Sequence, residues 1–318
     1  MSTEGGTRAV VAALLANTGI AITKFVAAGI SGSASMLAEG VHSLADSGNQ
    51  VLLLVGGRRS RKEATETHPF GYGRERYVFA FVVAIILFSV GGMFSLYEGI
   101  HKLEAHEDLN LPWIPLLVLA VAIVLESFSL RTAVIEANKA RGSDSLFAYI
   151  RHAKQPELPV ILLEDMAALT GLVFAFAGVG LSLLTGDVIW DAIGTIAIGV
   201  LLIAVAVILG IETKSLLVGE GATRTDVDKI RAAFEAHPSV EAIIHMKTLY
   251  LGPDELMVAA KVAVPKTTKA SEIAKAINEI EVAVREAVPV ARVIYIEPDI
   301  YVAGSNTKTD AIIIPGHD

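Results

Sequence analysis

The chain has 318 residues, of which 53% are hydrophobic and 19% are charged, and its formal net charge is −8. A soluble domain of ordinary composition is about 45–50% apolar and about 25% charged, so this chain has an apolar surplus. The absence of cysteine excludes a disulfide scaffold and every thiolate metal site. The acidic balance argues against nucleic acid as a partner, because binding phosphates requires a basic surface.

Long apolar segments contain most of this surplus. A helix needs roughly 20 mostly apolar residues to cross a bilayer, and six segments meet that requirement. The first could be mistaken for a signal peptide, but it carries Lys24 and another apolar segment follows at once, so we expect it to be retained. The sequence therefore predicts a lipid bilayer as a partner and six transmembrane helices, at about 9–30, 35–56, 77–100, 112–135, 159–184 and 188–211.

Positive charge is concentrated in alternate connections. The loops after the second and fourth segments contain several Lys and Arg residues, whereas the other connections contain almost none. Because such loops stay in the cytoplasm, both termini are predicted to be cytoplasmic. With no targeting extension recognisable, a bacterial-type inner membrane is the simplest expectation.

The last third of the chain has the composition of a soluble domain. Helical periodicity at 224–236 and 271–287 alternates with strand patterns at 240–250, 255–264 and 290–297. The order α-β-β-α-β predicts a small cytoplasmic α+β domain of ferredoxin-like or metallochaperone-like type. We therefore expect a transport domain at 1–211, a dimerisation domain at 212–300 and a loose tail at 301–318.

Ionisable residues inside apolar segments are costly and indicate function. In the second segment Glu39, His42, Asp46 and Asn49 follow spacings of three, four and three, which place them on one helical face. Imidazole and carboxylate four residues apart can form half of a site for zinc or a neighbouring metal. An isolated His–Asp pair equally fits an interhelical hydrogen bond, but a second charged helix favours a metal site. That helix is the fifth segment, which contains Glu164 and Asp165.

Other polar residues in these segments have simpler interpretations. Lys24 lies near a segment end and is expected to extend toward the interface. Glu126 stands alone and is interpreted as structural. Asn17 either joins the polar network or contributes to helix packing.

The stretch Ala38-Glu39-Gly40-Val41-His42-Ser43-Leu44-Ala45-Asp46 resembles the second helix of the cation diffusion facilitator family, and His68-Pro69-Phe70-Gly71-Tyr72-Gly73-Arg74 resembles the loop after it. The stretch Leu163-Glu164-Asp165-Met166-Ala167-Ala168 is similar to the branch related to mitochondrial zinc transporters. The resemblance implies a homodimer that exports a divalent cation, usually Zn²⁺, in exchange for protons.

The resemblance also implies a tetrahedral site with two ligands from each of two helices. His42, Asp46 and Asp165 match three of these positions, but Ile161 occupies the fourth. Either Glu164 replaces the missing ligand, or three protein ligands bind the metal together with water. Extra carboxylate favours Mn²⁺, Fe²⁺ or Co²⁺ relative to a site richer in histidine, so metal preference stays open.

The predicted mechanism is alternating access of one site for which metal and protons compete. No enzyme motif such as H-E-x-x-H is present, and no cofactor beyond the transported metal is expected. A metal-gated channel or sensor, and coupling to another cation, remain alternatives. The family's second metal-binding loop is reduced here to His68, a weak metal contact at most, which more simply fixes the loop.

Overall fold

The computed structural model describes residues 3–105, 110–142 and 145–300, with side chains from residue 17 onward. The chain divides into two compact units, at residues 1–217 and 218–318. The predicted loose tail at 301–318 lies outside the described residues.

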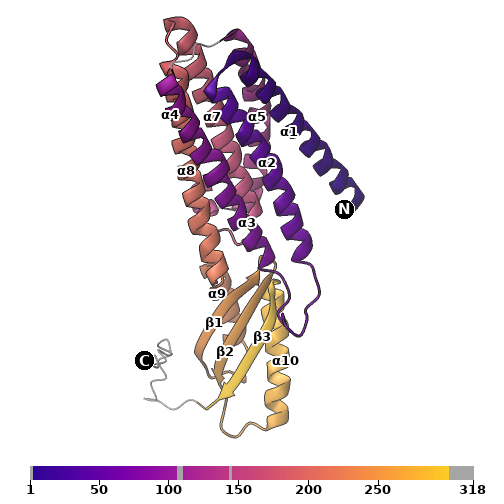
Figure 1. The fold of residues 1–318 in the computed structure, drawn as a ribbon. Helices are drawn as coiled ribbons and strands as arrows, with labels where there is room; N and C mark the ends of the chain where they lie inside the picture. Colours follow the sequence, from indigo (N-terminus) through magenta and orange to yellow (C-terminus); the bar gives the residue numbers. More distant parts are fainter. Residues whose placement is uncertain (1–2, 106–109, 143–144, 301–318) are drawn as a thin grey trace, which may run out of the picture. The chain divides into compact units, whose positions relative to one another are not determined.

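The first unit is a bundle of long helices (Figure 1). Each predicted apolar segment lies within one long helix, and helices α3, η1 and α4 together form one continuous helix of 31 residues. The elements are α1 (Thr3–Ser31), α2 (Ala34–Arg59), α3 (Glu75–Ile86), the π-helix η1 (Leu87–Met93), α4 (Phe94–Ala105), α5 (Trp113–Ala140), a short α6 (Leu146–His152), α7 (Glu157–Thr185) and α8 (Ile189–Val218).

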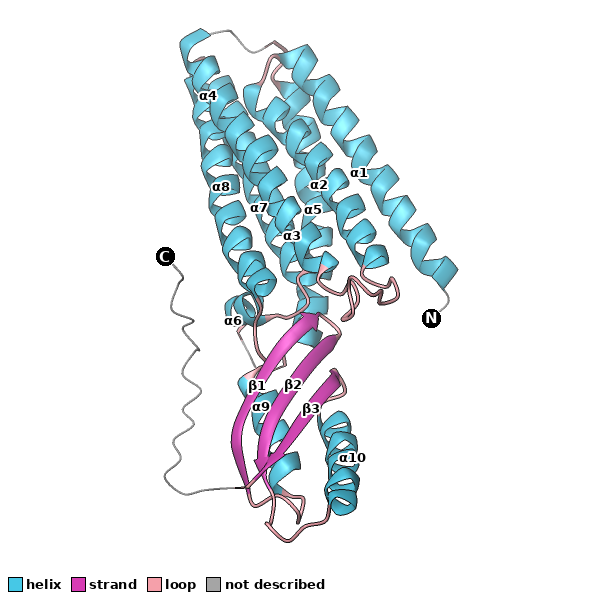
Figure 2. Cartoon of the chain, turned by 60° about the horizontal axis from the view of Figure 1, so that its bottom comes forward, coloured by secondary structure: helices cyan, strands magenta, loops and turns pink. Residues whose placement is uncertain are grey.

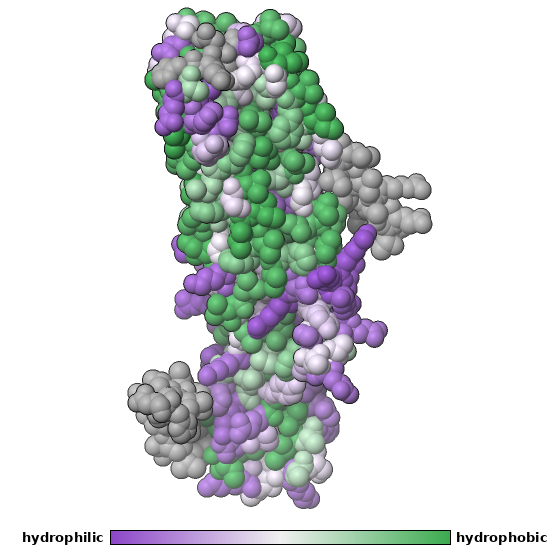
Figure 3. Space-filling model, viewed as in Figure 1, coloured by the Kyte–Doolittle hydropathy of each residue, from purple (hydrophilic) through white to green (hydrophobic). Residues whose placement is uncertain are grey.

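In the described part of the chain, four helices are long and apolar enough to cross a membrane: 75–105, 113–140, 157–185 and 189–218. Hydrophobic residues cover most of the visible side of this unit in Figure 3. In this unit Leu117, Phe128 and Val200 are more than half exposed, as expected of side chains that face lipid. The sequence predicted six spans, and four of them are supported here. Helices α1 and α2, with 29 and 26 residues, are not among these four, and the polar stripe of α2 lowers its hydropathy.

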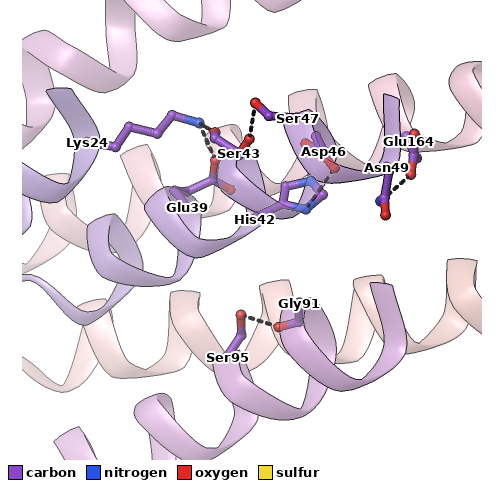
Figure 4. A network of polar contacts seen from close by, with 10 residues as sticks. All are labelled: Lys24, Glu39, His42, Ser43, Asp46, Ser47, Asn49, Gly91, Ser95 and Glu164. Atoms are coloured by element: carbon purple, nitrogen blue, oxygen red, sulfur yellow. Dashed lines mark hydrogen bonds and ion pairs between the residues drawn. The ribbon is translucent and has the colours of Figure 1, made fainter. Parts of the chain in front are cut away.

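Glycines allow the third long helix to approach α8 closely. A Cβ on Gly92 would lie 2.6 Å from Ile203, and one on Gly99 would lie 2.7 Å from Ile196. Small residues at such contacts let helix backbones pack closely where no water drives association. Gly92 lies within the π-helix, and Ser95 Oγ donates to the Gly91 carbonyl at 2.7 Å in the same stretch (Figure 4).

A carboxylate on α8 binds the first turn of α2. Asp191 is fully buried and accepts hydrogen bonds from Ser33 Oγ at 2.9 Å, Ala34 N at 2.8 Å and Ser35 N at 3.3 Å, and also from Ser35 Oγ. The first N–H groups of a helix lack intrahelical partners and carry partial positive charge, so an anion stabilises them. Asp191 therefore fixes the position where α2 begins.

The second unit contains α9 (Arg224–Glu235), β1 (Ala242–Gly252), β2 (Glu255–Ala263), α10 (Ala270–Ala287) and β3 (Ala291–Asp299), in the predicted α-β-β-α-β order. The sheet order is β1-β2-β3, with β1 antiparallel and β3 parallel to the central β2 (Figure 2). Phe234 of α9 and Val284 of α10 are buried with Val258 of β2 in one core.

A lysine joins the two parallel strands of this sheet. Lys261 Nζ on β2 lies 3.0 Å from Glu297 and 3.0 Å from Asp299 on β3. The hydrogen bond from Lys261 lowers the pKa of Asp299. This contact therefore depends on pH.

Candidate metal site

The polar stripe predicted on α2 faces the interior of the helical unit. The Glu39, His42 and Asn49 residues are at most 1% exposed, and Asp46 is partly buried. Helix α2 packs against α1, α3 and α7. Burying four polar residues on one helical face has a desolvation cost, so this arrangement indicates a functional site.

The His42 side chain has no hydrogen-bond partner in the described part of the chain. Both ring nitrogens are buried and make no hydrogen bond, and Asp46 Oδ1 makes none either, although it lies 3.5 Å from Nδ1, within ion-pair distance (Figure 4). Buried polar atoms without partners are rare in folded proteins because each retains its desolvation penalty. An imidazole and a carboxylate in this condition are suited to accept a cation.

The two carboxylates of α7 point toward different helices. Glu164 Oε1 accepts a hydrogen bond from Asn49 Nδ2 of α2 at 2.8 Å. Asp165 Oδ2 accepts one from Ser129 Oγ of α5 at 2.9 Å. Successive residues on a helix are about 100° apart, which accounts for this divergence.

Within the described ranges, no three His, Asp or Glu side chains converge closely enough to enclose a metal ion. Asp165 and Glu126 both act electrostatically on Asp46, and Asp46 acts on Glu164. Glu126 of α5 was interpreted as structural from the sequence. The candidate ligands His42, Asp46, Glu164 and Asp165 therefore lie on two helices, α2 and α7, that pack against each other.

The expectation that Lys24 extends toward the membrane interface is wrong. Lys24 is 1% exposed, and its Nζ lies 3.0 Å from Glu39 Oε2 and 2.7 Å from Ser43 Oγ (Figure 4). Its flexible stem turns inward because a carboxyl and a hydroxyl group on α2 are within hydrogen-bonding distance, which the α1 sequence alone does not reveal.

The remaining candidates lie apart from this cluster. Asn17 is half-buried on α1, two turns before Lys24. The His68 ring stacks on Tyr72 at 4.6 Å between centroids, and its Nδ1 lies 3.0 Å from Thr67 Oγ1. Those contacts fit a role in fixing the loop.

Asp191 is a polar residue whose role the sequence analysis did not find. It follows Trp190 at the start of an apolar segment, and only its spatial neighbours on α2 show why it is there.

Two family domains together cover almost the whole chain. Residues 10–218 match the cation efflux transmembrane domain, and residues 222–299 match the cation efflux protein cytoplasmic domain. The chain belongs to the cation efflux family. The resemblance to cation diffusion facilitators is thereby confirmed, and the protein is a membrane protein of a cation-transporter family.

Curated relatives include zinc transporters of mitochondria. The human protein named proton-coupled zinc antiporter SLC30A9, mitochondrial, is 32% identical over 263 residues, which cover 81% of this chain and 46% of that protein. The Xenopus laevis protein of the same name is 32% identical over 265 residues, covering 82% and 47%. Metal tolerance protein C4 of Arabidopsis thaliana is 29% identical over 257 residues, covering 80% and 56%. The chain therefore spans about half the length of these relatives, and the similarity to the mitochondrial branch is confirmed.

Proposed function

We propose that this cation efflux protein exports Zn²⁺ from the cytoplasm in exchange for protons, as a secondary transporter without enzymatic activity. Family membership supports cation efflux, and the relatives named proton-coupled zinc antiporters support both zinc and proton coupling. The ligands are His42, Asp46 and Asp165. Glu164 is the fourth ligand, because Ile161, at the family's fourth ligand position, cannot coordinate a metal.

The observation that carries this proposal is the buried His42 ring beside Asp46 Oδ1, neither of which makes a hydrogen bond within the described residues. Only a deprotonated imidazole and deprotonated carboxylates bind metal, so metal and protons compete for the same atoms. If the site opens to each side of the membrane in turn, this competition couples metal movement to proton movement. Asn49 and Ser129 each donate to one oxygen of Glu164 and Asp165, so the second oxygen of each carboxylate can ligate the ion while these hydrogen bonds orient it.

The same proposal includes the architecture around the site. We take α1 and α2 as the two further spans, which gives six, and both termini as cytoplasmic on the distribution of Lys and Arg in the loops. The second unit acts as a homodimerisation domain. A bacterial-type inner membrane is the proposed location, although the relatives named above are mitochondrial, and membrane fractionation of the source cells would test it.

Transport by the purified full-length chain in proteoliposomes with an internal pH dye tests the function. Zn²⁺ added outside should drive a saturable, pH-linked flux, and His42→Ala or Asp46→Ala should abolish it. His101→Ala provides a matched control, because His101 is exposed on α4 and should leave the flux unchanged. Persistence of the full flux in both site variants would refute the assignment.

A second candidate function is export of Mn²⁺, Fe²⁺ or Co²⁺ by the same site. The observation that favours it is Ile161, which is exposed and has no atom that can coordinate a metal, together with the carboxylates around Asp46. Harder ions accept a higher proportion of carboxylate oxygen than zinc does. Comparing the four metals in the same assay decides between them, while flux that neither saturates nor follows the proton gradient would indicate a channel.

A further inference from the structure

A buried ion pair joins α1 to the polar stripe of α2. Lys24 and Glu39 are 1% and 0% exposed, and Nζ lies 3.0 Å from Glu39 Oε2 (Figure 4). Ser43 Oγ accepts a second hydrogen bond from the ammonium at 2.7 Å, while Glu39 Oε1 has no partner in the described part of the chain. A buried ion pair recovers its desolvation cost only with good geometry and further hydrogen bonds, so stability alone is a weak reason for this pair.

The ammonium lies beside the proposed metal ligands. Ser43, to which it donates, is the next residue after His42. Lys24 also acts electrostatically on His42, Asp46 and Glu126. Its positive charge therefore opposes any cation that enters the site.

The charge balance of the site suggests why a positive charge would be useful beside it. Metal binding requires deprotonated ligands, and the carboxylates of Asp46, Glu164 and Asp165 would then carry more charge than one divalent ion. Attraction between them and the ion is strong where water is excluded. A site with such an excess would bind the metal tightly and release it slowly. A fixed positive charge nearby reduces the affinity and favours release.

We propose that Lys24 is a built-in counter-charge that weakens metal binding at the His42 site, and that Glu39 moderates this effect. The inference rests on the proposed function, since it concerns the affinity of that site. In this proposal Lys24 acts through its charge and does not contact the metal. Glu39 holds the ammonium in place and offsets part of its field.

A double-mutant cycle on the full-length protein tests the proposal. Zn²⁺ affinity is measured by competition with a fluorescent chelator for the wild type, Lys24→Gln, Glu39→Gln and the double variant. Lys24→Gln should tighten binding by about ten- to hundredfold, since Coulomb repulsion over several ångströms inside a protein is of that order. Glu39→Gln should weaken binding, and the double variant should return close to the wild-type affinity.

The opposite signs distinguish an electrostatic role from a structural one. A pair that served only to hold α1 against α2 would lower the thermal stability in both single variants and tighten binding in neither. Weaker or unchanged binding in Lys24→Gln overturns the proposal. If Lys24→Gln does not fold, Glu39→Gln is compared with the double variant instead. The double variant must then bind Zn²⁺ more tightly than Glu39→Gln.

Lys102→Gln provides the matched control. Lys102 is also buried, but its Nζ donates to the Gly32 carbonyl at 2.9 Å, at the α1–α2 turn. Gly32 precedes His42 by ten residues, about 15 Å along a helix, so this variant should not change the affinity. Absence of Zn²⁺ binding in the wild type, or full binding in His42→Ala, would contradict the proposed function itself, whereas the sign of the Lys24 effect tests only the counter-charge.

Discussion

Removal of the Asp191 carboxylate should destabilise the helical unit strongly. Asp191→Ala deprives two hydroxyls and two backbone N–H groups at the start of α2 of their acceptor. Each hydrogen bond to a charged group contributes about 1.5–3 kcal/mol, but the four share one carboxylate and do not add. A buried donor left without an acceptor costs about 1–3 kcal/mol, so for the four donors together we expect a loss of about 3–5 kcal/mol in unfolding free energy.

Unfolding of the purified full-length chain in mixed micelles, with rising SDS and circular dichroism as the readout, measures that loss. Asp187→Ala is the matched control, because Asp187 is exposed and its side chain accepts a hydrogen bond from Ile189 N at 3.0 Å. Asp191→Asn keeps one acceptor oxygen and should fall between the wild type and Asp191→Ala. A loss for Asp191→Ala no larger than that of the Asp187 control would refute the reasoning that this carboxylate fixes α2.

Three further predictions concern the ligands, the sheet and the helix packing. Glu164→Gln should weaken Zn²⁺ binding by about tenfold or more and Glu126→Gln by less, measured by chelator competition; the reverse order would give the fourth ligand position to Glu126. Because the pKa of Asp299 is lowered from 3.8, its stabilising contact with the β2 lysine is present above that pH and lost as the pH falls through the lowered value. Asp299→Asn should therefore lower the thermal unfolding midpoint of the second unit, within the full-length chain, at pH 7 but not at the acid limit, and a difference that persists in acid would contradict the ionic origin. Gly92→Ala should cost about 1–3 kcal/mol in the micelle assay through overpacking, whereas Gly210→Ala, with open space around its Cβ, should be neutral, and equal losses would contradict the close-packing argument.

Periodicity was sufficient to predict most elements of the fold. The long apolar segments became long helices because a backbone in an apolar environment must satisfy its own hydrogen bonds. The second unit's α-β-β-α-β order followed from local period and turn residues, which depend on neighbouring positions alone. Membrane crossing by α1 and α2 stays a prediction, since the polar stripe that marks the site also weakens the apolar signal.

The burial of the candidate residues on α2 was predictable from the sequence, whereas the contacts of the candidate site were not. Spacing alone placed His42 and Asp46 on one buried face, and adjacency alone implied that Glu164 and Asp165 diverge. Their partners Asn49 and Ser129 depend on which helices pack against α7. That packing is a tertiary property, so the sequence left open which carboxylate completes the site.

The sequence by itself determined that charged residues must be buried in a largely apolar bundle, because their number and position are incompatible with lipid. Only the tertiary structure decided how each charge is compensated. Lys24 turned inward because Glu39 and Ser43 stand within hydrogen-bonding distance on the next helix, and Asp191 met the first turn of α2 from more than 150 positions away. A long-range electrostatic partner has no local signature, because the energy that selects it depends on distance in space and not along the chain.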